Sequence, residues 1–133
     1  MPPAFADTFF FLALLNAKDA AHPKAIAFAR DASRELITTA WVLTEVADGC
    51  AARGNGTAFV ELMDALLESP EIEVVPPTAE GFQAGLALYR DRSDKRWTLT
   101  DCISFEVMRQ RGLTDALTGD RHFEQAGFRA LLK

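Results

Sequence analysis

The chain has 133 residues, enough for one domain with a buried core and too few for two. Its composition, 49% hydrophobic and 25% charged, is typical of a soluble globular protein and excludes a fibrous or low-complexity chain. The net charge of −5 disfavours binding to a polyanion over the whole surface, because phosphate binding requires positive charge.

The longest apolar run covers residues 9–15 and is too short to cross a bilayer. It also differs from a secretory signal, since no Lys or Arg precedes it and Asp7 lies next to it. Cys50 and Cys102 lie far apart and form no CxxC pair, which favours a reducing compartment over a disulfide scaffold. We therefore expect a cytoplasmic protein that does not interact with a membrane.

The first half of the chain alternates short apolar runs with helical patterns. We predict strands over residues 4–6 and 36–38, and helices over residues 9–17, 22–32, 40–52 and 57–67. The third helix ends near Gly54, and the fourth ends before Ser69 and Pro70.

The second half continues the alternation. We predict strands over residues 72–75 and 115–118, and helices from Thr78 to residue 90, over residues 100–110 and over residues 121–125. Residues 91–97 form a polar loop. Strands that alternate with helices indicate an α/β protein with a central parallel sheet covered on both faces.

Four acidic residues lie in settings that suggest a shared site: Asp7, Glu45, Asp101 and Asp120. Asp7 follows the first predicted strand, and Asp101 and Asp120 lie at the starts of predicted helices. Open α/β sheets bind their ligands outside the carboxyl ends of the strands. Carboxylates that converge there repel one another unless a hard cation such as Mg²⁺ or Mn²⁺ neutralises them, which suggests metal-assisted phosphoryl chemistry.

Each acid also has an ordinary structural explanation. Asp7 and Asp120 suit the N-cap position of a helix, and the sequence from Thr98 to Asp101 matches a capping box. Glu45 lies within a helix beside Trp41 and would most often be half exposed. Only the presence of all four acids favours the metal site over these separate roles.

Basic residues gather before the helix of Asp101, at Arg90, Arg92, Lys95 and Arg96, and Arg121 lies farther along the chain. They form either a local phosphate-binding rim or an ordinary solvated loop. The two histidines, His22 and His122, have no neighbours at zinc-ligand spacing, so we expect no zinc site.

Four motifs resemble, in order and approximate spacing, those of a PIN-domain ribonuclease, and most closely the VapC-type toxins of bacterial toxin–antitoxin pairs. The motifs are Asp7-Thr8-Phe9, Val42-Leu43-Thr44-Glu45-Val46, Leu99-Thr100-Asp101-Cys102-Ile103-Ser104-Phe105 and Leu117-Thr118-Gly119-Asp120-Arg121-His122-Phe123. The resemblance extends from about residue 4 to residue 128. Two positions depart from the family pattern: the first strand is less rich in Val and Ile, and Gly119 replaces a commonly bulky residue.

The resemblance implies a three-layer α/β/α PIN fold that occupies residues 1–133 as one domain. It implies that Asp7, Glu45, Asp101 and Asp120 bind one or two Mg²⁺ or Mn²⁺ ions and hydrolyse RNA. Thr8 and Thr118 would support the carboxylates or hold a phosphate oxygen. Phosphate contacts would come from Arg90, Lys95, Arg96 and Arg121.

The resemblance also implies two protein partners, a cognate antitoxin and a second copy of the chain in a homodimer. Apolar surface around Phe10, Leu14 or Phe28 could serve either contact, although core packing is the usual role of such residues. Two other functions remain open. A PIN-like module can bind RNA or act as a scaffold without cleaving, and an aspartyl phosphatase also places an Asp after its first strand. The phosphatase typically needs a second Asp two residues on, where this chain has Phe9.

Overall fold

Five parallel strands form one central sheet in the computed structural model, which describes residues 1–133. The strand order is β3-β2-β1-β4-β5, and each neighbouring pair is parallel. The strands are β1 (Ala4–Ala6), β2 (Leu36–Thr39), β3 (Ile72–Val75), β4 (Asp115–Leu117) and β5 (Arg129–Ala130).

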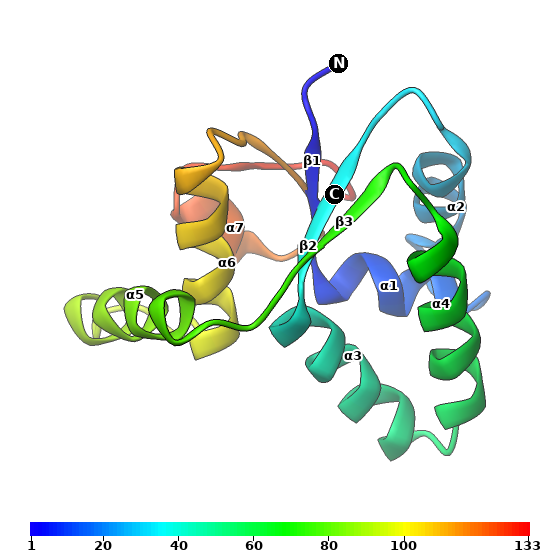
Figure 1. Cartoon of the computed structure of the whole chain (residues 1–133), viewed down its shortest axis with the longest axis horizontal. Coiled ribbons are helices and arrows are strands. Elements are labelled where there is room, and N and C mark those ends of the chain that lie inside the picture. Colours follow the sequence, from blue (N-terminus) through cyan, green and yellow to red (C-terminus); the bar gives the residue numbers. More distant parts are fainter.

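The chain has seven helices. They are α1 (Thr8–Leu15), α2 (His22–Arg30), α3 (Ala40–Ala52), α4 (Gly56–Glu68), α5 (Ala79–Asp91), α6 (Leu99–Gln110) and α7 (Arg121–Gln125). Helices α1, α2 and α4 lie on one side of the sheet, and α5, α6 and α7 lie on the other (Figure 1). The three-layer α/β/α architecture and the central parallel sheet predicted from the sequence are confirmed. None of the helices has the length and apolar character required to span a membrane.

The strand order places a switch point at β1. From β1 the chain continues outward through β2 and β3, then crosses back to add β4 and β5 on the other side of β1. Phe5 pairs with Ile37 of β2 on one side and with Ala116 of β4 on the other. Connections leave β1 and β4 in opposite directions, so a crevice opens between their carboxyl ends, where α/β proteins bind ligands.

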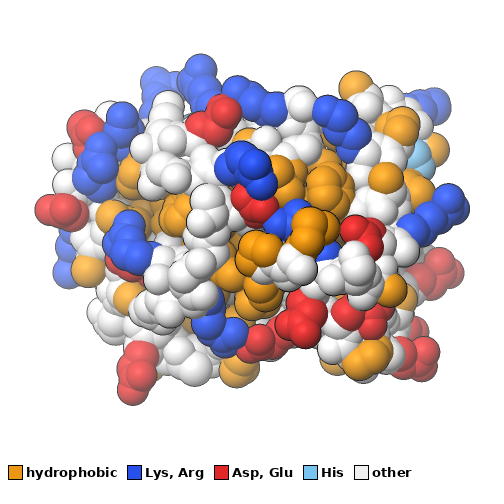
Figure 2. Space-filling view, turned by 90° about the horizontal axis from the view of Figure 1, so that it is seen from above, with side chains coloured by type: hydrophobic (Ala, Val, Ile, Leu, Met, Phe, Trp, Pro, Cys, Tyr) orange, Lys and Arg blue, Asp and Glu red, His pale blue; other side chains and the backbone are white.

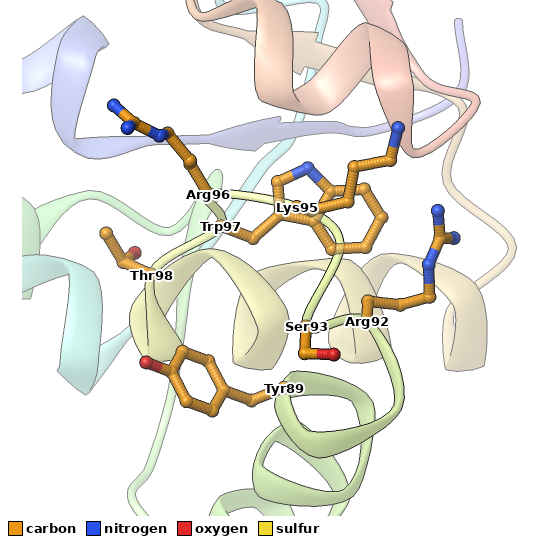
Figure 3. A pocket seen from close by; sticks show the side chains of 7 residues that line it. All are labelled: Tyr89, Arg92, Ser93, Lys95, Arg96, Trp97 and Thr98. Carbon is orange, nitrogen blue, oxygen red and sulfur yellow. The ribbon is translucent and has the colours of Figure 1, made fainter.

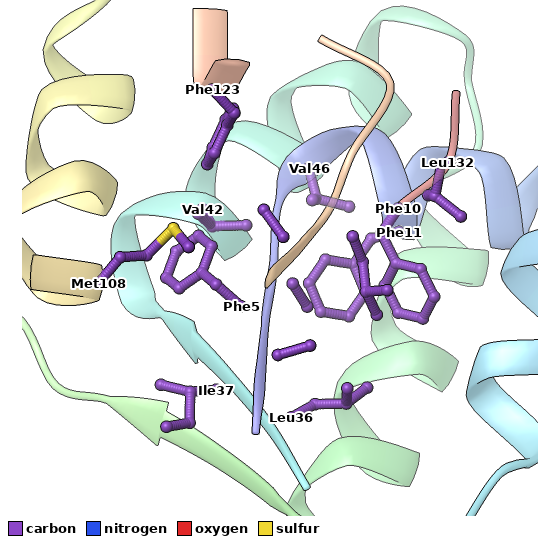
Figure 4. Packing of buried hydrophobic residues seen from close by; sticks show 14 of the residues in the cluster. Phe5, Phe10, Phe11, Leu36, Ile37, Val42, Val46, Met108, Phe123 and Leu132 are labelled. Atoms are coloured by element: carbon purple, nitrogen blue, oxygen red, sulfur yellow. The ribbon is translucent and has the colours of Figure 1, made fainter. Parts of the chain in front are cut away.

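Aromatic side chains fill the core on both sides of β1. Phe5, Phe10 and Phe11 are at most 1% exposed, and Figure 4 shows the Phe10 and Phe11 rings side by side. Phe123 of α7 packs edge-on against Phe105 of α6, with ring centroids 4.9 Å apart. Because helices cover both faces of β1, its whole Ala-Phe-Ala sequence is buried without the alternation of a half-exposed strand.

The predicted elements are confirmed, with boundaries that shift by up to two residues. The strand β5 was not predicted, because two residues cannot show a periodic pattern. Its position depends on contacts distant in sequence: the Arg129 N–H donates to the Thr114 carbonyl at 2.9 Å, and the Arg129 side chain bonds to Asp115.

Two sequence expectations need correction. The segment predicted as a polar loop contains a buried anchor, Trp97, whose ring packs edge-on against Phe105 and whose Nε1 donates to Gln125 at 3.0 Å. Phe10 cannot offer surface to a partner, because it is 1% exposed and lies in the core. Leu14 and Phe28 are half-buried and pack against the same core.

A buried ion pair joins strands β2, β4 and β5 at the ends where they begin. Asp115 accepts a hydrogen bond from Arg34, which precedes β2, and two bonds of 2.9 Å from Arg129 of β5. These guanidinium contacts, first from Arg129 and then from Arg34, lower the pKa of Asp115. Beyond this cluster, basic and acidic side chains are interspersed over the face seen in Figure 2.

Helix α5 packs closely on α6 because Gly85 has no side chain. A Cβ atom at Gly85 would lie 2.2 Å from Ile103 Cγ1 and 3.0 Å from its backbone. We predict that Gly85→Ala lowers the free energy of unfolding by about 1–3 kcal/mol, because α5 must move away from α6. Urea denaturation measures this change. The matched control is Gly56→Ala in α4, where a Cβ meets no atom within 4 Å; an equal loss in both variants would contradict the packing argument.

Candidate active site

The four acids identified in the sequence line one cavity at the carboxyl ends of β1 and β4. This cavity, here called the acidic cavity, has a volume of about 250 Å³. It is lined by Asp7, Thr8, Phe9, Glu45, Thr98, Asp101, Asp120 and His122. No Lys or Arg side chain lines it, and His122 is the one basic side chain among its carboxylates.

Asp7 lies directly after β1 and is 5% exposed. It occupies the N-cap of α1, yet its side chain makes no capping hydrogen bond. Its Oδ2 instead accepts a 2.9 Å bond from the hydroxyl of Thr118, which follows β4. Burial raises the pKa of Asp7 to about 7, and the charges of Asp101 and Glu45 act in the same direction, although the Thr118 bond opposes the shift.

Glu45 reaches the acidic cavity from α3. Thr8, at the start of α1, donates its hydroxyl to Glu45 Oε1 and so fixes the carboxylate of a half-buried side chain. Thr39 caps α3 by accepting from the Val42 N–H at 3.1 Å, which sets where the helix begins and therefore where Glu45 lies. Both threonines expected to support the carboxylates, Thr8 and Thr118, thus contact an acid.

Asp101 serves as the third helical residue in a complete capping box. Its N–H donates to Thr98 Oγ1 at 3.0 Å, and its Oδ2 accepts from the Thr98 N–H at 3.1 Å. The capping box that the sequence offered as the alternative to a metal site is therefore present. It uses only Oδ2 of Asp101 and leaves Oδ1 without a hydrogen bond. Burial raises the pKa of Asp101, while the Thr98 and His122 bonds oppose that shift.

Asp120 is the N-cap of α7, and its Oδ1 accepts from the His122 N–H at 2.9 Å. This turn carries the His122 ring back over the cavity, where Nδ1 lies 3.1 Å from Asp101 Oδ2 and 3.5 Å from Asp120 Oδ2. One ligand atom from each of Asp101, Asp120 and His122 lies within 4.8 Å of the others.

His122 was not among the site residues predicted from the sequence. It has no His or Cys at zinc-ligand spacing, because its partners are carboxylates at the starts of two helices. The position of His122 two residues after Asp120 could have predicted that it lies at the site. When an acid caps a short helix, the second helical residue donates its N–H to that acid and lies beside it.

The acidic cavity suits a hard divalent cation. Its carboxylates are partly buried and close enough for their charges to raise the pKa of Asp7, and no Lys or Arg lines the cavity to compensate them. Mg²⁺ and Mn²⁺ prefer oxygen ligands such as carboxylates. Asp101 Oδ1 makes no hydrogen bond and is available as one of them. A single imidazole does not change that preference.

A second cavity of about 420 Å³, here called the basic cavity, lies at the end of α5 and along the loop to α6 (Figure 3). It is lined by Tyr89, Arg92, Ser93, Lys95, Arg96, Trp97 and Thr98. Thr98 lines both cavities, which are therefore adjacent.

Of the four basic residues expected to contact phosphate, Lys95 and Arg96 line the basic cavity. Arg90 of α5 and Arg121 of α7 are exposed and line neither cavity. The structure therefore separates the four residues into a pair beside the site and two isolated surface cations.

Gly119, between Thr118 and Asp120, allows close packing at the cavity wall. A Cβ atom there would lie 2.6 Å from the ring of Phe9, which lines the acidic cavity. The departure of Gly119 from the family pattern thus has a local explanation, since Phe9 fills the space that a side chain at position 119 would take.

The raised pKa of Asp7 predicts a pH dependence of stability. Because the folded-state pKa of about 7 exceeds the ordinary 3.8, the folded protein binds this proton more tightly than the unfolded chain. The free energy of unfolding in EDTA should therefore fall between about pH 4 and pH 7, by up to about 4 kcal/mol from this group. Asp7→Asn should lose less stability than wild type between pH 5 and pH 8 in urea denaturation. The exposed control Asp48→Asn should show the same pH dependence of stability as wild type. If Asp7→Asn also shows the wild-type dependence, the raised pKa of Asp7 is refuted.

Comparison with known proteins agrees with this geometry. The family model of the PIN domain matches residues 4–129. The crystal structure of VapC20 from Mycobacterium tuberculosis, described as a sarcin-ricin loop cleaving toxin, superposes with a TM-score of 0.87 at 29% identity, covering 96% of this chain and 98% of that one. FitAcB from Neisseria gonorrhoeae shares the fold, with a TM-score of 0.63 at 20% identity, covering 98% of this chain and 96% of that one. No curated protein matches the chain. The chain belongs to the PIN-domain family, and it is similar to VapC20 over nearly its whole length.

Proposed function

We propose that this protein hydrolyses RNA phosphodiester bonds in a reaction that requires Mg²⁺ or Mn²⁺ held by Asp7, Glu45, Asp101 and Asp120. The observation that supports this most strongly is the meeting of these four acids, from four separate parts of the chain, in one cavity that no Lys or Arg lines. The cavity lies at the switch point of the sheet, and the family is one of nucleases.

The protein's part in the reaction is placement. A bound divalent cation would neutralise the carboxylates, polarise the phosphate and lower the pKa of water. The carboxylates are held in position before it binds: Thr118 holds Asp7, Thr8 holds Glu45 and the capping box holds Asp101. Such preorganised groups need little rearrangement during the reaction.

His122 contributes a contact to two of these acids. Its Nδ1 reaches both Asp101 and Asp120, so the ring spans the gap between the starts of α6 and α7. This contact connects the carboxylates of Asp101 and Asp120 through one side chain.

We also propose two protein partners, an antitoxin that inhibits the enzyme and a second copy of the chain, and a cytoplasmic site of action. An apolar groove of about 350 Å³ between α3, α4 and β3 supports a protein contact; it is lined by Ala40, Leu43, Thr44, Ala47, Phe59, Met63 and Val74. Val60 and Leu67 of α4 are 58% and 75% exposed. Both cysteines are free and buried, as a reducing compartment allows. Co-purification with the product of a neighbouring small gene would test the antitoxin, and light scattering would test the dimer.

Asp101→Asn should reduce RNA cleavage at least 100-fold, because a charged ligand is lost while the amide oxygen can still accept from the Thr98 N–H. Cleavage of a structured RNA that contains a sarcin–ricin loop is measured with Mg²⁺, Mn²⁺ or EDTA. The matched control is Asp48→Asn, an exposed acid on α3 outside the cavity. Full activity of Asp101→Asn would refute the proposed site. A folded wild type that binds metal and RNA without cutting any RNA would favour a scaffold instead, and hydrolysis of a phosphomonoester alone would favour a phosphatase.

Thr118→Val should weaken Mn²⁺ binding by about 10- to 100-fold, since residues that orient metal ligands typically have effects of this size. The hydroxyl donates to Asp7, so its removal raises the pKa of a carboxylate that must be ionised to bind metal. Calorimetric titration at pH 7 measures the affinity. Thr44→Val, which removes an exposed hydroxyl on α3, should leave it unchanged, and an equal effect in both variants would contradict the role of Thr118.

A further inference from the structure

We propose that the basic cavity is a nucleotide subsite, which holds an unpaired nucleotide of the RNA next to the scissile phosphate: Tyr89 stacks on its base, and Lys95 and Arg96, which point to opposite sides of Trp97 in Figure 3, bind phosphates of the RNA backbone on either side. This inference rests on the proposed ribonuclease function and specifies how the substrate is held.

The position of the basic cavity is the first observation. Thr98 lines both cavities, caps α6 with its hydroxyl and donates its N–H to Asp101. The last residue of the loop that forms the basic cavity is therefore bonded to an acid of the proposed active site. An RNA strand with its scissile phosphate in the acidic cavity would place a neighbouring nucleotide across Thr98.

The charge of the basic cavity is the second observation. Neither Lys95 nor Arg96 forms a salt bridge, and no Asp or Glu lines the cavity. Arg92, by contrast, is bonded to Asp94 at 3.0 and 3.1 Å and lies 5.0 Å from the Trp97 ring centroid. These two cations without a salt bridge give the cavity a local positive charge in a protein of net charge −5, and positive charge is what phosphate binding requires.

An aromatic ring exposed at the same cavity is the third observation. Tyr89 is 48% exposed although it is large and partly apolar, and its hydroxyl makes no hydrogen bond. In Figure 3 it lies toward the Thr98 side of the view, whereas Arg92 and Lys95 lie on the other side. Proteins bind unpaired RNA through this combination of cations for the backbone and aromatic rings for the bases.

The loop that carries these groups is fixed in position. Trp97 is 6% exposed, packs edge-on against Phe105 and donates to Gln125 of α7. Lys95 and Arg96 directly precede this anchor. They therefore project from a positioned segment, which limits the entropy lost when RNA binds. The cavity volume of about 420 Å³ lies within the ordinary range for small-molecule sites.

The test measures binding rather than cleavage, so that failure of the subsite and failure of the nuclease can be distinguished. The probe is a fluorescein-labelled single-stranded RNA octamer, and its anisotropy is followed in EDTA with the full chain. A second octamer that has the same backbone and no bases separates stacking from phosphate binding.

Tyr89→Ala should weaken binding of the RNA octamer roughly 5- to 150-fold, the size of effect reported for base–aromatic stacking, and leave the octamer without bases unaffected. Tyr89→Phe should bind RNA like wild type. The double variant Lys95→Ala/Arg96→Ala should weaken binding of both octamers and reduce the slope of log affinity against log salt by about 0.7 per cation. The control Arg30→Ala/Arg53→Ala removes two exposed cations elsewhere.

Wild-type affinity in Tyr89→Ala, or equal losses in the two double variants, would overturn the subsite even if the enzyme cleaves RNA. No measurable binding of the RNA octamer by wild type would also overturn it. If wild type binds the octamer with the expected variant pattern but cleaves no RNA, the subsite stands and the proposed function fails.

Discussion

Mutual repulsion among carboxylates in a partly buried cavity is the constraint on which the rest of this structure depends. Asp7, the most buried of the four acids, has a pKa raised to about 7, mainly by burial and further by its acidic neighbours. Such a group destabilises the folded state at neutral pH, so the cost must be offset by the aromatic core that surrounds β1 and by the hydrogen bonds to each acid. The same charge, which no Lys or Arg of the cavity compensates, is what a divalent cation would neutralise in the proposed function.

Two acids of the site also hold the fold locally. Asp101 and Asp120 each cap the helix on which they lie, and each still presents an oxygen to the cavity. The capping and site roles looked like alternatives in the sequence, but a carboxylate has two oxygens and the structure uses them separately. Thr98 joins the two adjacent cavities in a similar way, because one residue caps α6, bonds to Asp101 and lines the basic cavity.

The sequence predicted the strands and helices well where hydrophobic pattern and capping residues agree, as at Thr78 and Thr98, whose side chains cap α5 and α6. It also predicted which acids would meet: Asp7 and Asp120 follow parallel strands, which end at one edge of the sheet, whereas Glu45 and Asp101 were added through the resemblance to the PIN family. It failed where long-range contacts decide. Strand β5 depends on Asp115, the buried position of Trp97 depends on Phe105 and Gln125, and the position of His122 depends on the start of α6. The sequence could not show that Lys95 and Arg96 line a cavity whereas Arg90 and Arg121 do not, because this depends on how the loop before α6 folds.

The contact between Gly119 and Phe9 has a consequence for how this family varies. The two positions lie in different motifs, 110 residues apart, yet a Cβ at position 119 would come within 2.6 Å of the Phe9 ring. A larger residue at position 119 therefore requires the Phe9 ring to move aside, or a smaller residue at position 9. Covariation at these two positions would alter the shape of the cavity wall while all four acids stay in place, which is one route by which related enzymes could diverge in the RNA they accept.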